Sequence, residues 1–486
     1  MAEADAGVQD AIVIGGGPAG LFAAWRLAVG GAGVTLLEAG GGMRASLCGK
    51  VTARMQGRTV RPAEKFRLQC QRCDCLTGLG GAAFHFDTNL GYVQGLSRTK
   101  VEHDGKGGFR TYSGLERALG DFDRAARAVA DTYEVMYRFG LPPARAGGHG
   151  PQEPAGSPAD PDGSPGRAGF VLADEAFSQA ITVDDALTVV DNLLADALAH
   201  GLRLRLDTRA ERVRRRTDGT WQVSAGGADL LARNVVVAVG KLGLRFVRSV
   251  LDDNAVAYRP SGRVDLGVRL EAPREIVAPL TASCHNPKLT YLNERGEPVR
   301  TFCVCEGGRM MQYAFLDTVV LDGQHCLTTP TQRTNFGIVT TVDVPAGGDG
   351  SEYALDFARR VNATGAGGPV VQPLLELLGR GRVPQPPGSS LVQAVQGDLA
   401  AALGPERVAD IAGMVDRMED LTPGLVGPAT VVAAPVVERL FPAVELSDDL
   451  QSSAAGLYLA GDCSSKIIGV TYGAATGVVT AESILR

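Results

Sequence analysis

The sequence predicts an α/β fold built on a parallel sheet, and three separated parts of the chain carry this prediction. Near the N-terminus, an apolar run over 11–14 enters a glycine-rich turn, a helical pattern follows, and a second apolar run covers 34–37. A further apolar run over 234–240 ends in glycine, and another over 457–462 ends in Gly-Asp. Short apolar runs bounded by glycine are typical of fully buried strands, so we expect a buried strand at each of these segments.

The first turn has the spacing of a dinucleotide-binding motif. Glycines stand at Gly15, Gly17 and Gly20 in the pattern G-x-G-x-x-G, and Pro18 opens the helix. The first glycine permits a tight turn, the second lets the backbone approach a pyrophosphate, and the third lets the helix pack on the strand. The helix N-terminus adds unpaired N–H groups. Glu38, after the second strand, can accept hydrogen bonds from a ribose diol and would repel a 2′-phosphate, which argues against NADP.

The next elements are predicted from periodicity and from breakers. Apolar residues recur every three or four positions over 115–139, which predicts a helix. Residues 146–169 are rich in proline, glycine and serine, and we expect a surface linker there. Thr182 and Asp185 form a helix start of the capping-box type, and that helix should end at Gly201.

Short strands account for much of the remainder. Residues 202–206 alternate apolar and charged side chains, and 212–216 and 221–224 flank an Asp-Gly pair typical of a hairpin. The segment 262–425 alternates strand-like runs with loops and contains no second strand–G-x-G-x-x-G–helix unit. A terminal helix should follow Gly469.

Composition excludes several classes of function. The chain has 486 residues, enough for two or three domains, and a formal net charge of −6, which offers no electrostatic case for nucleic acid. No apolar stretch reaches the roughly 18 residues of a membrane span, and the acidic start lacks the layout of a signal peptide. Nine cysteines and six histidines suggest neither a disulfide framework nor a histidine metal site. We expect a cytoplasmic protein with a small-molecule substrate and no metal, and its oligomeric state stays open.

Several segments resemble known flavoproteins. Residues 12–40, 234–240 and 457–477 resemble the FAD-binding segments of the glutathione-reductase-like superfamily, whose members have two dinucleotide-binding domains. The runs 75–82, 265–271 and 301–308 resemble poorly characterised bacterial FAD-dependent dehydrogenases of that superfamily. The resemblance implies a discontinuous FAD-binding Rossmann domain with an inserted mixed α+β substrate domain. The implied limits are 8–120, 170–260 and 426–486 for the FAD-binding parts, 121–169 for a helix and linker, and 261–425 for the substrate or cap domain.

The resemblance also implies a cofactor site. The turn from Gly15 to Gly20 would hold the FAD pyrophosphate, Glu38 the adenosine ribose, and Asp462 a hydroxyl on the flavin side. The start of the terminal helix would direct N–H groups at the flavin's pyrimidine edge, where they would stabilise negative charge. The full predicted set is Gly15, Gly17, Pro18, Ala19, Gly20, Glu38, Ala39, Arg44, Gly80, Gly81, Gly240, Gly461, Asp462, Gly469, Val470 and Thr471. The chain departs from its relatives at Cys463, where they usually have glycine or alanine, and a small-residue substitution is the favoured interpretation.

Catalytic candidates lie beside the predicted flavin-lining turns. His85 follows Gly80-Gly81 and could act as acid or base, although a single histidine is more often a hydrogen-bonded structural residue. Asp87 would share its face if the segment is extended, or would cap a loop. Tyr472 completes the predicted catalytic set, and Lys241 and Lys466 are further polar candidates for binding substrate.

The cysteines permit three interpretations. Cys70, Cys73 and Cys75 could be structural, could form a redox pair, or could bind a metal with a fourth ligand such as Cys48. The structural interpretation is favoured, because buried free cysteines pack as small hydrophobic residues. Cys303 and Cys305 would point the same way on a strand, and packing is favoured there too.

The expected function is that of an enzyme, an FAD-dependent oxidoreductase of the dehydrogenase or oxidase type. It would transfer a hydride between a small organic substrate and flavin N5, in a setting such as specialised metabolism. The missing second nucleotide-binding unit argues against a built-in NAD(P)H site. Two alternatives stay open, a flavin monooxygenase with an external reductant and a non-catalytic FAD-binding protein.

Overall fold

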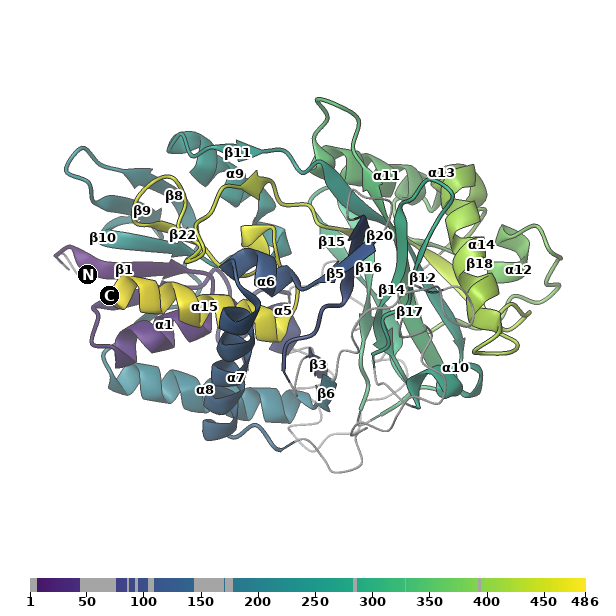
Figure 1. Ribbon diagram of the computed structural model, residues 1–486, viewed down its shortest axis with the longest axis horizontal. Helices are drawn as coiled ribbons and strands as arrows, with labels where there is room; N and C mark the ends of the chain where they lie inside the picture. Colours follow the sequence, from purple (N-terminus) through teal and green to yellow (C-terminus); the bar gives the residue numbers. More distant parts are fainter. Residues whose placement is uncertain are drawn as a thin grey trace.

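The computed structural model describes residues 7–43, 76–84, 87–91, 95–103, 109–143, 170, 178–282, 286–327, 329–391 and 395–486. Two large sheets organise these residues into two parts, with the N- and C-termini both on the first (Figure 1). The expected linker over 146–169 lies outside the described residues, as do Arg44, His85 and the cysteines at 48, 70, 73 and 75.

The first sheet confirms the N-terminal prediction. The glycine turn joins β1 (Gln9–Ile14) to α1 (Pro18–Val29), and β2 (Val34–Leu37) returns parallel to β1. β10 (Ala228–Val237) lies on the other side of β1, also parallel, and β22 (Leu457–Leu459) pairs with β10. The outer strands are β7 (Arg203–Arg205), beside β2, and the antiparallel pair β9 (Trp221–Ala225) and β8 (Ala210–Arg215), beside β10. The Asp-Gly hairpin is therefore confirmed.

Both faces of this sheet are covered. In β1, Ile12 and Ile14 join the apolar cluster that continues toward the second sheet, whereas Ala11 and Val13 face the helices. Those helices are α1, α8 (Val183–Ala199) and α15 (Val470–Leu485), with α15 running beside α1 (Figure 1). Successive strand side chains point to opposite faces, so a strand buried on both sides reads as a continuous apolar run. Thr182 and Asp185 form the expected capping box at the start of α8.

Three element boundaries differ from the predictions. The expected helix over 115–139 is two helices, α6 (Gly114–Leu119) and α7 (Phe122–Arg138), because Gly120 adopts φ +78° and Asp121 caps a new helix. β10 ends at Val237, and a short 3₁₀ turn, η2 (Lys241–Gly243), follows Gly240. β22 ends at Leu459, and Gly461–Ser464 forms a second 3₁₀ turn, η3.

The second sheet is mostly antiparallel. Its strand order is β13 (Thr290–Leu292), β14 (Pro298–Cys305), β17 (Arg333–Asp343), β12 (Arg263–Pro273), β20 (Val431–Glu438), β18 (Val370–Pro373) and β19 (Val395–Gln396). A hairpin of β15 (Arg309–Phe315) and β16 (Thr318–Gln324) packs beside it. The helices of this part are α10 (Arg274–Thr281), α11 (Gly350–Thr364), α12 (Leu374–Leu377), α13 (Ala400–Leu403) and α14 (Pro405–Glu419). β20 belongs to this sheet, although it lies after residue 425, where we expected the cap domain to end.

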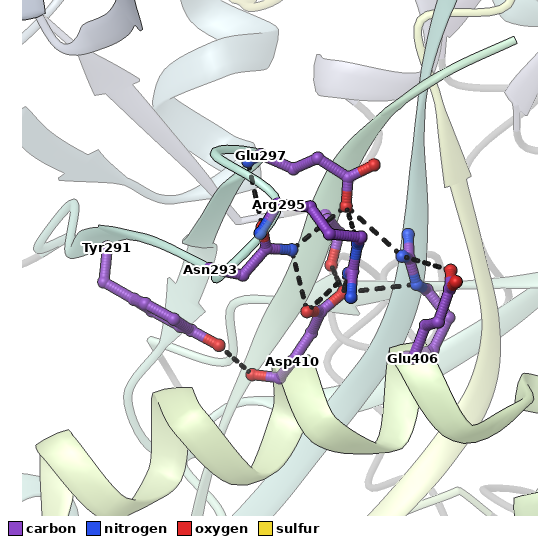
Figure 2. Close-up of polar contacts among 8 residues, drawn as sticks. Tyr291, Asn293, Arg295, Glu297, Glu406 and Asp410 are labelled. Carbon is purple, nitrogen blue, oxygen red and sulfur yellow. Dashed lines mark hydrogen bonds and ion pairs between the residues drawn. The ribbon is translucent and has the colours of Figure 1, made fainter. Parts of the chain in front are cut away.

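A polar network fastens α14 to the second sheet (Figure 2). The carboxylate of Asp410, which is almost fully buried, accepts hydrogen bonds from Arg295 at 2.8 and 2.9 Å and from Thr340 at 2.8 Å. Tyr291 donates to the Asp410 carbonyl at 2.7 Å. A buried charge that is paired and fully hydrogen-bonded costs little, so this network specifies where the helix docks.

Short elements complete the described chain. They are α5 (Gly81–Phe84), β3 (Thr88–Gly91), β4 (Lys100–His103), β5 (Phe109–Tyr112), β6 (Ser178–Ile181), α9 (Leu244–Asp253), β11 (Tyr258–Arg259) and β21 (Ala443–Val444). β3 pairs with β6, β4 with β5, and β11 with β21. Within the described residues, none of the helices combines the length and apolar character that crossing a bilayer requires.

Candidate functional site

A cavity of about 1780 Å³ is bounded by residues of both parts of the molecule. One end is formed by the β1–α1 turn and by Glu38, and the middle by η2, η3 and the start of α15. The other end is formed by β14, the β15–β16 hairpin and the residues after β20. Ligand sites in α/β proteins lie at the carboxyl ends of parallel strands, and this cavity opens at those ends of β1 and β10.

The glycine turn leaves room beside it at one position. A Cβ at Gly15 would lie 2.6 Å from the Ala238 carbonyl oxygen, and one at Gly20 would lie 1.8 Å from the Gly15 oxygen. The protein's own packing therefore demands glycine at both positions. A Cβ at Gly17 would meet nothing closer than the Gly81 Cα at 3.9 Å. Space next to Gly17 fits the close approach of a ligand to the backbone.

Two helices begin at this cavity. α1 starts after Gly17 and α15 after Gly469, and no described side chain caps either helix by a hydrogen bond. The first N–H groups of a helix have no partner inside it, and they carry the positive end of the helix dipole. Such ends bind phosphate groups and other anions well. The arrangement fits a cofactor with a pyrophosphate near α1 and a ring that accumulates negative charge near α15.

Glu38 organises the loops at this end. One carboxylate oxygen accepts from the Gly16 N–H at 2.7 Å, and the other accepts from Gly40 at 2.8 Å and Gly78 at 2.9 Å. A carboxylate has about four acceptor sites, so three bonds leave room for one hydroxyl donor. Glu38 also lines the cavity. The structure thus adds a scaffolding role that the sequence did not indicate.

The Gly461-Asp462 turn brings an acid to the middle of the cavity. Burial and the neighbouring Glu438 raise the pKa of Asp462 to about 6. The next residue, Cys463, is fully buried, and its thiol donates to the carbonyls of Val237 and Ala460, each at 3.1 Å. Burial raises the pKa of the Cys463 thiol, which makes it a poor nucleophile and supports its interpretation as a small packing residue.

Lys241 joins the two parts of the molecule across the cavity. From η2, its ammonium donates to Glu438 Oε1 and the Val437 carbonyl, each at 2.7 Å, and to the Tyr313 hydroxyl at 2.9 Å. Burial alone would lower the pKa of Lys241, but Glu438 and Tyr313 raise it above its ordinary value. Lys241 is therefore a fixed positive charge, and burial raises the pKa of Glu438 despite this partner.

In the wall formed by the second sheet, two arginines lie beside one buried carboxylate, that of Asp265. Asp265 is fully buried and accepts from Arg300 at 2.5 Å, while the Arg439 guanidinium lies 3.0 Å away. Burial would raise the pKa of Asp265, but Arg439 and Arg300 hold it well below its usual range. Lys100 lies close by, and burial together with Arg300 lowers its pKa. Lys100, Arg300 and Arg439 all line the cavity.

Two cysteines and a histidine meet on the same wall. The Sγ atoms of Cys303 and Cys305 are 3.7 Å apart, and both lie within 4.8 Å of a ring nitrogen of His325. The fully buried Arg269 donates to Cys305 Sγ at 3.3 Å. The hydrogen bond between the two thiols and burial raise the pKa of the Cys303 thiol, and burial lowers the pKa of His325.

The two predicted catalytic residues that the structure describes, Asp87 and Tyr472, both line the cavity. Asp87 lines the cavity, but its two oxygens accept from the N–H groups of Val183 at 3.0 Å and Leu327 at 2.8 Å. Both oxygens of Asp87 are therefore bonded to backbone N–H groups, one of them at the start of α8. The Tyr472 hydroxyl is buried and lies 2.9 Å from the Ser113 hydroxyl. Lys466 lines the cavity, and burial lowers its pKa.

The predicted cofactor set gathers at one end and the middle of the cavity. All of its described members except Gly20 and Gly80 line the cavity: Gly15, Gly17, Pro18, Ala19, Glu38, Ala39, Gly81, Gly240, Gly461, Asp462, Gly469, Val470 and Thr471. Gly20 is packed against Gly15, and the Gly80 N–H donates to the Gly16 carbonyl at 2.7 Å.

Sequence reasoning missed the polar wall of the second sheet. Arg300 comes from β14 and Tyr313 from β15, whereas Glu438 and Arg439 are neighbours at the end of β20, and no local motif connects the three places. One signal was present in β12, where the fully buried residues Asp265, Arg269 and Glu271 interrupt an apolar run. Charged residues are almost never fully buried without partners, so three of them in one buried strand indicate a polar site beside it.

Comparisons with known proteins leave the class open. No family model matches this chain, and no curated protein matches its sequence. Among solved structures, it is similar to CtdE in complex with FAD, at 10% identity over 97% of this chain and 82% of that one, with a TM-score of 0.35. It is also similar to NikD, described as an unusual amino acid oxidase essential for nikkomycin biosynthesis, at 12% identity over 98% and 94% of the two chains, with a TM-score of 0.34.

A third similar structure is a flavoprotein/dehydrogenase from Cytophaga hutchinsonii, at 12% identity over 99% of this chain and 78% of that one, with a TM-score of 0.35. Identities and TM-scores this low decide neither the fold family nor the chemistry.

Proposed function

We propose that this chain is an FAD-dependent oxidoreductase that acts on a small organic substrate. One observation carries the proposal: a single cavity begins at the G-x-G-x-x-G turn and at Glu38, passes Asp462 and the start of α15, and ends at a polar wall of the second sheet. A dinucleotide seated at the turn would thus have its far end facing a second set of polar side chains.

The residues that would hold the cofactor follow from the geometry. Gly17 and the N–H groups that open α1 would bind the pyrophosphate, and the remaining acceptor site of Glu38 would bind the adenosine ribose. Asp462 would accept a hydroxyl hydrogen on the flavin side, and the uncapped N–H groups of α15 would face the ring. When bound, FAD supplies two-electron chemistry at N5, as hydride transfer to or from the substrate.

The chain's own residues prepare the substrate end. Lys241 holds a positive charge beside Asp462 and Glu438. Arg300 and Arg439 share the single carboxylate of Asp265, so this part of the wall has an excess of positive charge. Such a wall would orient a substrate that carries an anionic group.

The test begins with the purified protein. We expect it to be yellow, to release FAD on heat denaturation, and to lose colour when a substrate is added without oxygen. A colourless protein that fails to take up added FAD would refute the proposal. The test variant is Gly17→Ala, which should fold like the wild type but bind FAD at least about tenfold more weakly.

The same anaerobic titration separates the alternatives. If NAD(P)H reduces the flavin and none of the tested metabolites does, the proposal of a dehydrogenase or oxidase gives way to that of a monooxygenase. Bound FAD that none of these donors reduces would favour a non-catalytic role.

A further inference from the structure

The cysteine–histidine group in the cavity wall has no part in the proposed flavin chemistry. Cys303 and Cys305 lie at the end of β14, where the pairing with β17 is irregular between residues 302 and 305. His325 follows β16 and forms an isolated bridge with Asp87. Two segments of the fold thus bring two thiols and one imidazole together. Cys303 and His325 line the cavity, whereas Cys305 is fully buried behind them.

The spacing of the ligand atoms matches one metal ion. All three lie within 4.8 Å of one another, and the two sulfur atoms are 3.7 Å apart. Thiolates bind zinc at about 2.3 Å in tetrahedral geometry, which places two of them roughly 3.8 Å apart. A disulfide needs a sulfur–sulfur distance of about 2.05 Å, so the two thiols would have to move together to form one.

The surroundings are those of a supported ligand set. Arg269 donates to Cys305 Sγ at 3.3 Å and to the Cys303 carbonyl at 2.6 Å, and it is itself oriented by Asn335 at 2.6 Å. Hydrogen bonds to ligating atoms orient them, as at many metal sites. The charges also balance: a divalent ion with two thiolates is neutral, and Asp322, 3.5 Å from Arg269, offsets the guanidinium.

We propose that Cys303, Cys305 and His325 bind one Zn²⁺ ion, with a fourth coordination position that opens into the cavity. Binding would release two thiol protons and form two Zn–S bonds and one Zn–N bond. Three protein ligands with an open position are typical of catalytic zinc sites, where the ion polarises a bound oxygen atom. The ligand at the fourth position would be water or an oxygen atom of the substrate. This inference revises the expectation that these cysteines only pack and that the chain binds no metal.

The experiment measures zinc per chain by elemental analysis after dialysis against Zn²⁺ and then against buffer. The background protein has Cys70, Cys73 and Cys75 replaced by serine, which removes the other cysteine motif. We expect one zinc ion per chain in this background. Cys303→Ser with Cys305→Ser should abolish retention, and His325→Ala should weaken affinity at least about tenfold. X-ray absorption at the zinc edge should show two sulfur ligands and one nitrogen ligand from the protein.

Cys326→Ser is the matched control, because this thiol is adjacent to His325 but outside the group. It should retain zinc, and circular dichroism should show that every variant is folded. Equal zinc in the Cys303→Ser/Cys305→Ser variant and its parent would overturn the proposal. So would a Cys303–Cys305 disulfide found by mass spectrometry in the freshly purified protein. Neither readout requires flavin, so the outcome is independent of the function proposed above.

Discussion

Buried charges at single positions define the wall of the cavity. In β12, Asp265, Arg269 and Glu271 are all fully buried, and each has partners on other strands or loops. Glu271, for example, accepts from the Ser390 N–H at 2.9 Å and lies 3.1 Å from Arg333. Removing a buried charge from water is costly unless it is paired, so these partners determine which charges the wall can carry.

Asp462 should make stability depend on pH. Its pKa of about 6 in the folded protein exceeds its ordinary 3.8, so the folded state binds the proton more tightly than the unfolded state between these values. The contribution of Asp462 to stability should be largest below about pH 4 and should fall as the pH rises through 6, by about 3 kcal/mol at most. Urea unfolding of the cofactor-free protein across this range measures the effect. Asp462→Asn should lack this part of the slope, and an unchanged slope in that variant would contradict the assignment.

Lys241→Met should destabilise the fold by about 3 kcal/mol, because it leaves Glu438 without its cation in a mostly buried position. The double variant Lys241→Met/Glu438→Gln should recover much of the loss, since no unpaired carboxylate remains. The free energy of unfolding in urea tests both. Equal stability of the wild type and the single variant would show that the ion pair contributes nothing.

At the scale of elements, the β1–α1 turn and the start of α15 produce a place for an anion. Neither helix start has a side-chain cap among the described residues, and both border the cavity. The glycines of the turn differ in whether the protein's own packing would tolerate a Cβ. Gly15 and Gly20 are required by contacts within the protein, whereas a Cβ at Gly17 would fit and would occupy the space that we propose for the pyrophosphate.

Alanine at Gly17 and at Gly20 should therefore act differently. Gly20→Ala would place a Cβ 1.8 Å from a backbone oxygen and should cost about 1–3 kcal/mol of stability. Gly17→Ala should change stability by less than about 0.5 kcal/mol while weakening FAD binding. Thermal unfolding and equilibrium dialysis with FAD measure the two effects. Gly262→Ala, at an open position of the second part, should alter neither, and equal FAD affinity in Gly17→Ala and the wild type would rule out this site for the pyrophosphate.

At the scale of the whole molecule, the cavity is lined by residues from both parts of the fold. The apolar cluster that begins at Ile12 and Ile14 continues to Val268 and Val342 of the second sheet, and the Lys241 contacts bridge the same boundary. A ligand at this boundary would contact both parts and stabilise their association.

Removal of FAD should therefore lower the thermal stability of the entire described core. With free FAD at about 100 times its dissociation constant, binding would add about 2.7 kcal/mol. Calorimetry with and without added FAD checks this, and inorganic pyrophosphate serves as the control that lacks the flavin. A midpoint that stays constant over a range of FAD concentrations would show that the folded state has no affinity for it.

Local patterns predicted β1, α1, β2 and α8 closely, because glycine spacing, capping residues and apolar periodicity act over a few positions. The broken helix at Gly120 was foreseeable from its glycine, but periodicity on both sides obscured it. The Lys241 site could not be predicted in this way. Its partners Tyr313 and Glu438 lie 72 and 197 positions away, and no local pattern connects them. His85, the leading catalytic prediction, lies outside the described residues, so its role stays a prediction.

The sequence by itself determined where a dinucleotide would begin, since the turn from Gly15 to Gly20 and the acid at Glu38 dictate a local backbone shape whatever surrounds them. The tertiary structure alone decided what faces the other end of the cavity. There the side chains of Lys241, Glu438 and His325 meet only after two sheets have packed together. The physical reason is range: backbone sterics and capping act between neighbours along the chain, whereas burial and charge pairing act between any residues that the fold brings into contact.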